Sequence, residues 1–321
     1  MQHTTMKNRG IQVWALVALL FVGAAPLDIA KPSSQLDWSV YQDSTFEKWG
    51  SRFAFLALDP ASSKQLCQQA GPMFWRQVLD LSNDSSVIVH VQTRQTFGVL
   101  PAKFIDSLEH IGKLDSFAKA FRMALGFDSL APIKFVRGKS QFFQYHKIGP
   151  LMNEAFAVFR QQGLDPRIAE MLLLIESPNN PGGVSSSGAV GHFQLMPFVA
   201  KKYGLSVSPG HDERLDFSRS AYAAARLIKE YAEPNADAIC VAAGLEVDRQ
   251  ALWYQMLILH IYNAGAASVK EAAAVIGSAS DPYEWIQQFW KTKAGRFGNQ
   301  SQNYSQVALA SYCKYRDFLY H

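Results

Sequence analysis

The sequence has few of the residues from which metal centres are built. Three cysteines, Cys67, Cys240 and Cys313, are spread over 321 residues without the close spacing of metal ligands. Eight histidines are present, and no two of them have the spacing of a ligand pair. We therefore expect no metal and no cofactor.

Charged residues are also few. Asp, Glu, Lys and Arg make up 18% of the chain, and 31 basic against 27 acidic side chains give a net charge of +4. A weak positive balance tolerates an anionic polymer as a partner. The sequence lacks a basic and aromatic motif of the kind that binds nucleic acid, so we expect no nucleic-acid partner.

The apolar segment near the N-terminus is too short to cross a membrane. Val13–Ala25 contains thirteen residues without a charge, whereas a spanning helix needs about 20. Lys7 and Arg9 precede it, an order typical of a secretory signal peptide, here residues 1–24. An uncleaved N-terminal anchor is the alternative. We expect an exported protein, periplasmic or associated with the cell envelope, whose net charge falls to +2 after cleavage because 29 basic and 27 acidic residues remain.

Export would expose the cysteines to oxidising conditions. Cys240 and Cys313 could then pair and leave Cys67 single. The alternative is that all three are small buried hydrophobic residues. The sequence leaves both open.

The chain divides near residue 150. Residues 25–150 mix a helix-like segment (62–81), an alternating strand-like segment (87–91) and a helix or helix pair (101–126). They predict a smaller N-terminal region of α+β or α type, and no catalytic motif indicates its function.

Residues 151–321 read as a succession of helices, so we expect a mainly α protein with an all-helical C-terminal domain. The expected segments are 152–162, 165–177, 194–203, 217–231, 251–262, 268–276, one that opens at Asp281-Pro282, and 304–320.

Glu176 is the principal candidate for catalysis. Asp165-Pro166 is a good helix start, and the apolar residues that follow predict a buried helix that ends at Glu176. Burial and the negative end of the helix dipole both disfavour the carboxylate and raise its pKa. A carboxyl group that is protonated near neutral pH can act as a general acid. The alternative is a surface residue at a frayed helix end.

A glycine- and serine-rich loop follows Glu176 and contains Ser185, Gly188, Gly191, Gln194 and Met196. Glycine lets the backbone approach a ligand closely, and Ser and Gln provide short polar groups. A second motif, Tyr262-Asn263-Ala264-Gly265, follows farther along the chain.

These motifs resemble, in order and spacing, those of the soluble lytic transglycosylases, which carry the SLT domain and share the fold of goose-type lysozyme. The resemblance covers roughly residues 160–320. The matching residues are Glu176-Ser177, Asn180-Pro181, Ser185-x-x-Gly188-Ala189-x-Gly191, Gln194-x-Met196-Pro197, Tyr203-Gly204-Leu205, Asp212-Glu213-Arg214-Leu215-Asp216, Tyr262-Asn263-Ala264-Gly265 and Asn303-Tyr304.

The resemblance implies a lysozyme-like catalytic domain, at 151–321, that acts on the glycan strands of peptidoglycan. It implies cleavage of the β-1,4 bond between N-acetylmuramic acid (MurNAc) and N-acetylglucosamine (GlcNAc), with 1,6-anhydro-MurNAc ends as the product. Glu176 would be both acid and base. Ser185, Gln194, Met196 and Tyr262 would contact the sugars, and Asn263 would brace the loop beside Tyr262.

Two other functions remain open. A goose-type muramidase would hydrolyse the same bond, and a non-catalytic wall-binding or assembly factor would use the fold only for docking. In the last case the N-terminal region would carry the function, and in any case it could bind other envelope proteins.

Overall fold

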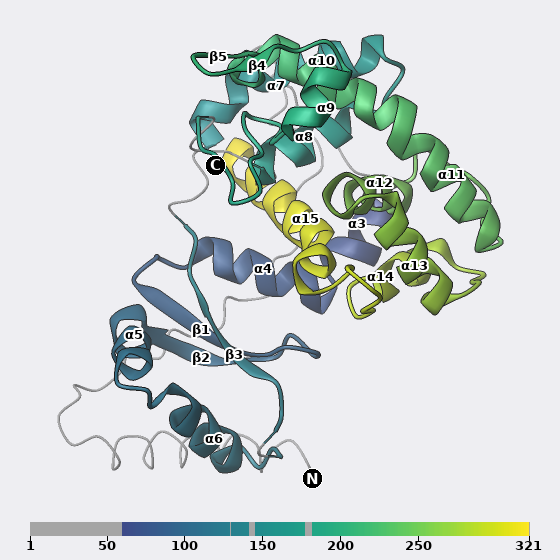
Figure 1. Cartoon of the computed structure of the whole chain (residues 1–321). Coiled ribbons are helices and arrows are strands. Elements are labelled where there is room, and N and C mark those ends of the chain that lie inside the picture. The colour runs from purple at the N-terminus through teal and green to yellow at the C-terminus, as the bar shows by residue number, and fades with distance from the viewer. Residues whose placement is uncertain (1–59, 129, 141–144, 177–181, 321) are drawn as a thin grey trace. The chain divides into compact units, whose positions relative to one another are not determined.

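The computed structural model describes residues 60–128, 130–140, 145–176 and 182–320 (Figure 1). Contacts divide the chain into two compact units. Within the described residues, the first unit spans 80–140, and the second combines 60–79 with 145–320. The expected signal peptide, residues 1–24, lies outside the described residues.

The first unit is a small α+β fold. Strands β1 (Ser85–His90), β2 (Thr96–Pro101) and β3 (Ile133–Arg137) form an antiparallel sheet in the order β2-β1-β3. Helices α5 (Ala102–His110) and α6 (Leu114–Ala124) add apolar side chains to the same core as the sheet. The buried core residues are Ile88, Leu100, Ile105, Leu108, Phe117, Phe121 and Ile133. The expected strand and helix pair are both present.

The two ends of this unit lie next to each other. The backbone N–H of Ser140 donates to the carbonyl of Leu81 at 2.9 Å. Gly138 also lies so close to that carbonyl that an added Cβ would be 2.4 Å from it. The chain therefore leaves the second unit after α4 (Ala70–Asp80), forms the first unit, and emerges close to where it entered.

The second unit is helical, which confirms the mainly α prediction. Its helices are α3 (Pro60–Cys67), α4, α7 (Tyr145–Gln161), α8 (Pro166–Ile175), α9 (Pro197–Lys202), α10 (Phe217–Leu227), α11 (Glu233–Ala242), α12 (Leu252–Ala264), α13 (Ala266–Ile276), α14 (Pro282–Gln288) and α15 (Asn299–Tyr320).

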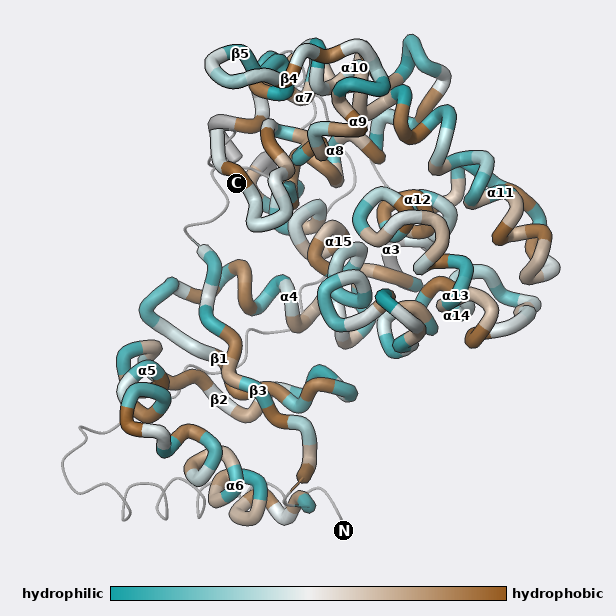
Figure 2. The backbone as a smooth tube through the Cα atoms, in the orientation of Figure 1, coloured by the Kyte–Doolittle hydropathy of each residue, from teal (hydrophilic) through white to brown (hydrophobic). Residues whose placement is uncertain are grey.

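Helix α12 lies at the centre of this unit. All residues from Leu252 to Ile261 are buried, including the polar Gln255 and His260. Helices such as α10 and α11 lie farther out, and in Figure 2 hydrophilic and hydrophobic residues alternate along them, as expected for helices with one buried face.

The early helices α3 and α4 pack with the helices of the second unit. The sequence predicted one helix over 62–81, but Pro72 cannot continue a helix from the preceding turn, and the chain breaks between Cys67 and Ala70. Leu66 and Leu79 are fully buried in the same core as α8, α12 and α15. The second compact unit thus includes helices from before residue 150, whereas the sequence predicted a single boundary there. That the catalytic function lies in residues 151–321 stays a prediction.

Helix α11 was not expected from the sequence. A π-helical turn, Ile228–Ala232, joins α10 to α11, although the sequence contains Glu233-Pro234. Proline has no N–H to donate to the preceding turn, and the wider turn accommodates that loss. Helix α9 is shorter than expected because Gln194 has a φ of 44° and Met196 is extended.

The three cysteines are buried, and none forms a disulfide. Of the two alternatives left open by the sequence, the structure has three buried thiols, and the thiol that hydrogen-bonds with Cys313 is that of Cys67. In the part of the chain that the structure describes, no helix combines the length and the apolar character that crossing a bilayer requires.

The adjacent ends of the first unit allow a direct test. We expect a chain in which a short Gly-Ser linker replaces residues 82–139 to keep the second unit folded. A chain that begins at residue 147 lacks α3 and α4 and should melt at least about 5 °C lower, or not fold, because buried leucines are lost. Thermal melts followed by circular dichroism compare the two. Equal melting temperatures would show that α3 and α4 do not stabilise the core.

Candidate active site

The acid-bearing helix forms as the sequence predicts. The Asp165 side chain accepts from the backbone N–H of Arg167 at 2.8 Å, and Pro166 occupies the first helical position. Every residue from Ile168 to Leu174 is buried. Glu176 is the C-terminal cap, so its carboxyl group lies at the end of an almost completely buried helix.

Burial dominates the electrostatics of Glu176. Loss of water raises the pKa of its carboxyl group from 4.5 to about 7, and a hydrogen bond from the Tyr304 hydroxyl to Oε1 opposes part of this rise. Tyr304 comes from the first turns of α15, more than a hundred residues later in the chain. Near neutral pH the carboxyl group can therefore both give and take a proton.

Tyr262 completes a meeting point of three helices. It lies near the end of α12, where its hydroxyl donates to the carbonyl of Phe193 at 2.6 Å. Burial, followed by the charge of Glu176, raises the pKa of the Tyr262 hydroxyl well above 10. The hydroxyl therefore stays protonated and ties α12 to the loop, while its oxygen can still accept from a ligand.

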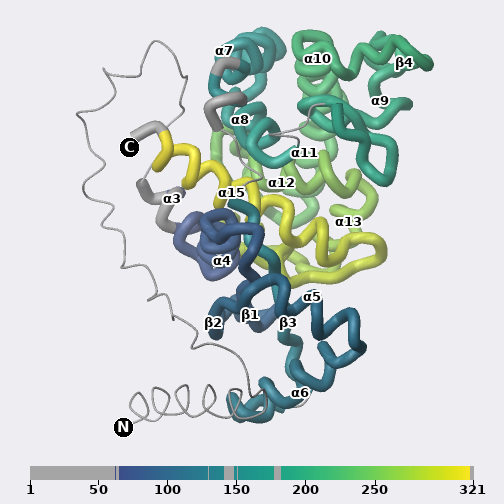
Figure 3. Tube along the Cα trace, turned by 90° about the vertical axis from the view of Figure 1, so that its left-hand side faces the viewer, coloured from purple at the N-terminus to yellow at the C-terminus, as the bar shows by residue number. Residues whose placement is uncertain are grey.

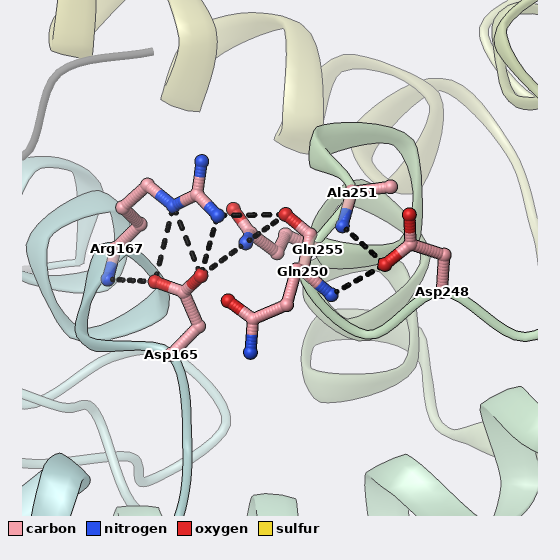
Figure 4. Close-up of polar contacts among 6 residues, drawn as sticks. All are labelled: Asp165, Arg167, Asp248, Gln250, Ala251 and Gln255. Carbon is pink, nitrogen blue, oxygen red and sulfur yellow. Dashed lines mark hydrogen bonds and ion pairs between the residues drawn. The ribbon is translucent and has the colours of Figure 1, made fainter. Parts of the chain in front are cut away.

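A polar cluster joins the N-terminal ends of α8 and α12, away from Glu176 and Tyr262 (Figure 4). Arg167 donates to both carboxylate oxygens of Asp165 and to the carbonyl of Gln250, the last at 2.7 Å. The buried Gln255 donates to Asp165 Oδ2 at 2.8 Å. The two helices thus meet at their starts through Asp165 and Gln255, and near their ends through Glu176 and Tyr262.

A second polar group fixes α15 against α12. The Oγ of Ser305 is 3.0 Å from His260 Nε2 and accepts from Trp290 Nε1 at 2.9 Å. Burial lowers the pKa of His260 to about 3, so the ring stays neutral and serves the packing. Because Ser305 follows Tyr304 directly, this group holds Tyr304 at Glu176.

The loop after Glu176 is shaped by its own hydrogen bonds. Residues Ser177–Pro181 lie outside the described residues, but the remainder forms a tight turn. Ser185 Oγ accepts from the N–H of Ala189 at 2.9 Å, Gln194 Nε2 donates to the carbonyl of Gly191 at 2.9 Å, and Val190 bridges Leu195. The side chains of Ser185 and Gln194 therefore stabilise the loop through hydrogen bonds to its own backbone.

Arg214 holds this loop through hydrogen bonds to its carbonyl groups. The sequence did not indicate this role. Arg214 is 5% exposed, and its Nη1 donates to the carbonyls of Gly188 and Leu195 at 2.8 and 2.9 Å. Gly191, with a φ of 87°, lies so close to the Arg214 carbonyl that a Cβ would be 2.0 Å from it. At Gly191 the close backbone approach is therefore to the protein's own chain.

Two further acidic residues that follow the loop in sequence, Asp212 and Glu213, form ion pairs with arginine side chains. Arg214 donates to both oxygens of Asp212, and this bond lowers the pKa of Asp212 below its usual value. Glu213 accepts from the N–H of Ser206 and pairs with Arg219 at 2.8 Å. In the described ranges, no group of three or more His, Cys, Asp or Glu residues is placed to hold a metal ion.

The remaining candidates lie around the same motifs. Met196 is the N-terminal cap of α9 and is half-buried against the core, and Asn263 is half-buried in the last turn of α12. His192 packs edge-on against Phe217 at 5.1 Å between ring centroids, and burial lowers its pKa. This contact gives His192 a packing role.

Residues 155–282 match the family model of the transglycosylase SLT domain. This segment belongs to the soluble lytic transglycosylases of the lysozyme-like superfamily. The recognition made from the sequence is thereby confirmed. No curated protein matches the chain.

The SLT domain match includes Glu176, Gln194 and Tyr262, but it ends before Tyr304. The structure brings Glu176, Tyr262 and Tyr304 together and adds Arg214 as the anchor of the loop. Asn303-Tyr304 was recognised as a family landmark, yet no spacing in the sequence indicates that its hydroxyl contacts the acid. The SLT domain supports peptidoglycan cleavage at the level of the family.

The raised pKa of Glu176 has a cost in stability. Its folded pKa of about 7 exceeds the unfolded value of 4.5, so the free energy of unfolding falls as pH rises between these values. We expect Glu176→Gln to be more stable than the wild type at pH 8, by up to about 3 kcal/mol, and the gap to close near pH 4. Thermal melts from pH 4 to 8 measure it. A pH-independent gap would contradict the buried charge.

The Tyr304 hydrogen bond lowers the pKa of Glu176, so its loss should raise that pKa further. We expect Tyr304→Phe to shift the alkaline limb of the pH profile of kcat/KM upward by about one unit while kcat falls at least tenfold. Tyr222→Phe, which alters an exposed hydroxyl on α10, is the matched control. An unshifted profile in Tyr304→Phe would place Tyr304 outside the proton-transfer site.

Proposed function

We propose that this protein is a peptidoglycan lytic transglycosylase. It cleaves the β-1,4 bond between MurNAc and GlcNAc and leaves 1,6-anhydro-MurNAc ends, with Glu176 as acid and then as base. The observation that carries the proposal is the half-buried Glu176, whose carboxyl group lies where α8, α12 and α15 meet and whose pKa is raised to about 7 by the loss of water there.

The first step needs a proton on the leaving group. Protonated Glu176 donates to the glycosidic oxygen while the carbonyl oxygen of the MurNAc N-acetyl group attacks C1 and forms a cyclic oxazolinium ion. The bond to GlcNAc breaks, and Glu176 is left as a carboxylate. The substrate's own acetamido group thus takes the place of the second carboxylate that most glycosidases use.

The second step returns the proton to Glu176. The carboxylate takes it from the C6 hydroxyl of MurNAc, whose oxygen attacks C1 and displaces the acetamido oxygen. The 1,6-anhydro ring closes without water, and Glu176 is again protonated. The hydrogen bond from Tyr304 stabilises the carboxylate between the two steps.

The engagement of the other acids supports a single-carboxylate mechanism. Asp212 and Glu213 are both held in ion pairs with arginine, so neither is an unpaired base that could activate water. This observation favours the lytic reaction over hydrolysis by a goose-type muramidase. The buried acid and its two tyrosines favour an enzyme over a wall-binding factor.

The sugar contacts proposed from the family need one refinement. Because Gln194 Nε2 donates to the carbonyls of Gly191 and Gly183 within the loop, Gln194 would contact a sugar by accepting from a hydroxyl through Oε1. The oxygen of Tyr262 would accept from the acetamido N–H. Ser185 and Met196 would act from the edges of this loop, and Asn263 would act from the last turn of α12.

The location of the reaction is also a proposal. A signal peptide at residues 1–24 would send the enzyme to the periplasm, where its substrate lies. The region at 25–150 would then be available for other envelope proteins, and the compact first unit within it is the part to test for such binding.

Product analysis tests the reaction. Purified peptidoglycan treated with the full chain should release fragments with anhydro-MurNAc ends, which are lighter by one water than hydrolysed ends. Glu176→Gln should reduce release at least about a thousandfold, because an amide cannot serve as the acid. Glu230→Gln, an exposed acid on the π turn, is the matched control and should be fully active. Hydrolysed ends would assign the muramidase reaction instead, and full activity of Glu176→Gln would exclude Glu176 as the acid.

A further inference from the structure

Two buried thiols meet where the first described helix contacts the last. Cys67 is the final residue of α3, Cys313 lies in α15, and each is 3% exposed. The Cys313 thiol hydrogen-bonds with the Cys67 thiol. Figures 1 and 3 both show α3 beside α15, and the two helices belong to the same unit and the same core.

Several other contacts hold α4, the helix that follows α3, against α15. Arg76 forms an ion pair with Asp317, and Lys314 Nζ donates to the carbonyl of Leu79 at 2.9 Å. Gly71 fits so closely against Gln306 that a Cβ there would be 2.0 Å from Oε1. These contacts run along α15 on both sides of Cys313, so they fix the position at which α3 arrives.

We propose that Cys67 and Cys313 form a disulfide when the chain folds under oxidising conditions, and that this bond ties α3 to α15. The two thiols lose two protons and two electrons as the S–S bond forms. The electrons reduce a disulfide of glutathione or of a thiol–disulfide exchange protein to two thiols. Oxidation takes place during folding, because in the folded protein both sulfur atoms are buried.

The third cysteine remains a thiol. Cys240 lies in α11, where Asp237 is its electrostatic neighbour and burial raises its pKa to about 12. The hydrogen bond with Cys67, followed by burial, also raises the pKa of the Cys313 thiol, so thiol reactivity in the folded protein does not distinguish the two cysteines. The selectivity therefore follows from packing, since α3 delivers Cys67 to Cys313.

The bond would close a loop that contains the first unit and the whole SLT domain match. A cross-link over so long a loop restricts the unfolded chain strongly, which stabilises the folded state. It also holds α15, the helix that presents Tyr304 to Glu176.

The test uses the full chain. Protein unfolded in denaturant and refolded with oxidised and reduced glutathione is treated with an alkylating reagent in denaturant and analysed by intact mass and peptide mapping. We expect one alkylated cysteine, Cys240, and one cross-linked peptide pair that joins Cys67 to Cys313. Three alkylated cysteines, a glutathione adduct, or a cross-link to Cys240 would overturn the proposal.

Thermal melts provide a second measurement. The oxidised protein should melt roughly 5–10 °C above the reduced protein. The matched control Cys240→Ser should keep this difference, and Cys67→Ser should abolish it. A difference that persists in Cys67→Ser would overturn the proposal, whatever reaction the active site performs.

Discussion

The second unit depends on one constraint, which is that the carboxyl group of Glu176 must lose most of its water where three helices meet. Glu176 needs burial to hold a proton near neutral pH, and burial needs α8, α12 and α15 to close around it. Tyr304 limits the cost by donating to the carboxylate. The site is therefore a compromise, in which the same desolvation that tunes the acid also destabilises its charged form.

The polar groups inside this unit serve that compromise by setting positions. Asp165 and Gln255 join the starts of α8 and α12, and His260 and Ser305 join α12 to α15. Arg214 adds the loop to this frame. Each of these side chains is buried and hydrogen-bonded, so a shift of one helix would leave polar atoms unsatisfied. The active-site geometry is thus held by interactions distant from the substrate.

The sequence was sufficient wherever the signal is local. The cap at Asp165 and the acid at Glu176 follow from neighbouring residues, and the family motifs led to the SLT domain. The contact between Tyr304 and Glu176 spans more than a hundred residues, and Arg214 acts on carbonyl groups, which are the same in every residue. Neither of these contacts produces a pattern of residue types that can be read from the sequence. Helix α11 was missed because Pro234 suggests an ending that the π turn avoids.

The placement of α3 and α4 has a consequence for the order in which the protein can fold. These helices leave the ribosome among the first described segments, yet their partner α15 is synthesised more than two hundred residues later. The first unit, whose contacts are local and whose ends meet, can form while synthesis continues. The core around Glu176 cannot close until α15 has been made, so the acid acquires its raised pKa only after that helix has joined α8 and α12.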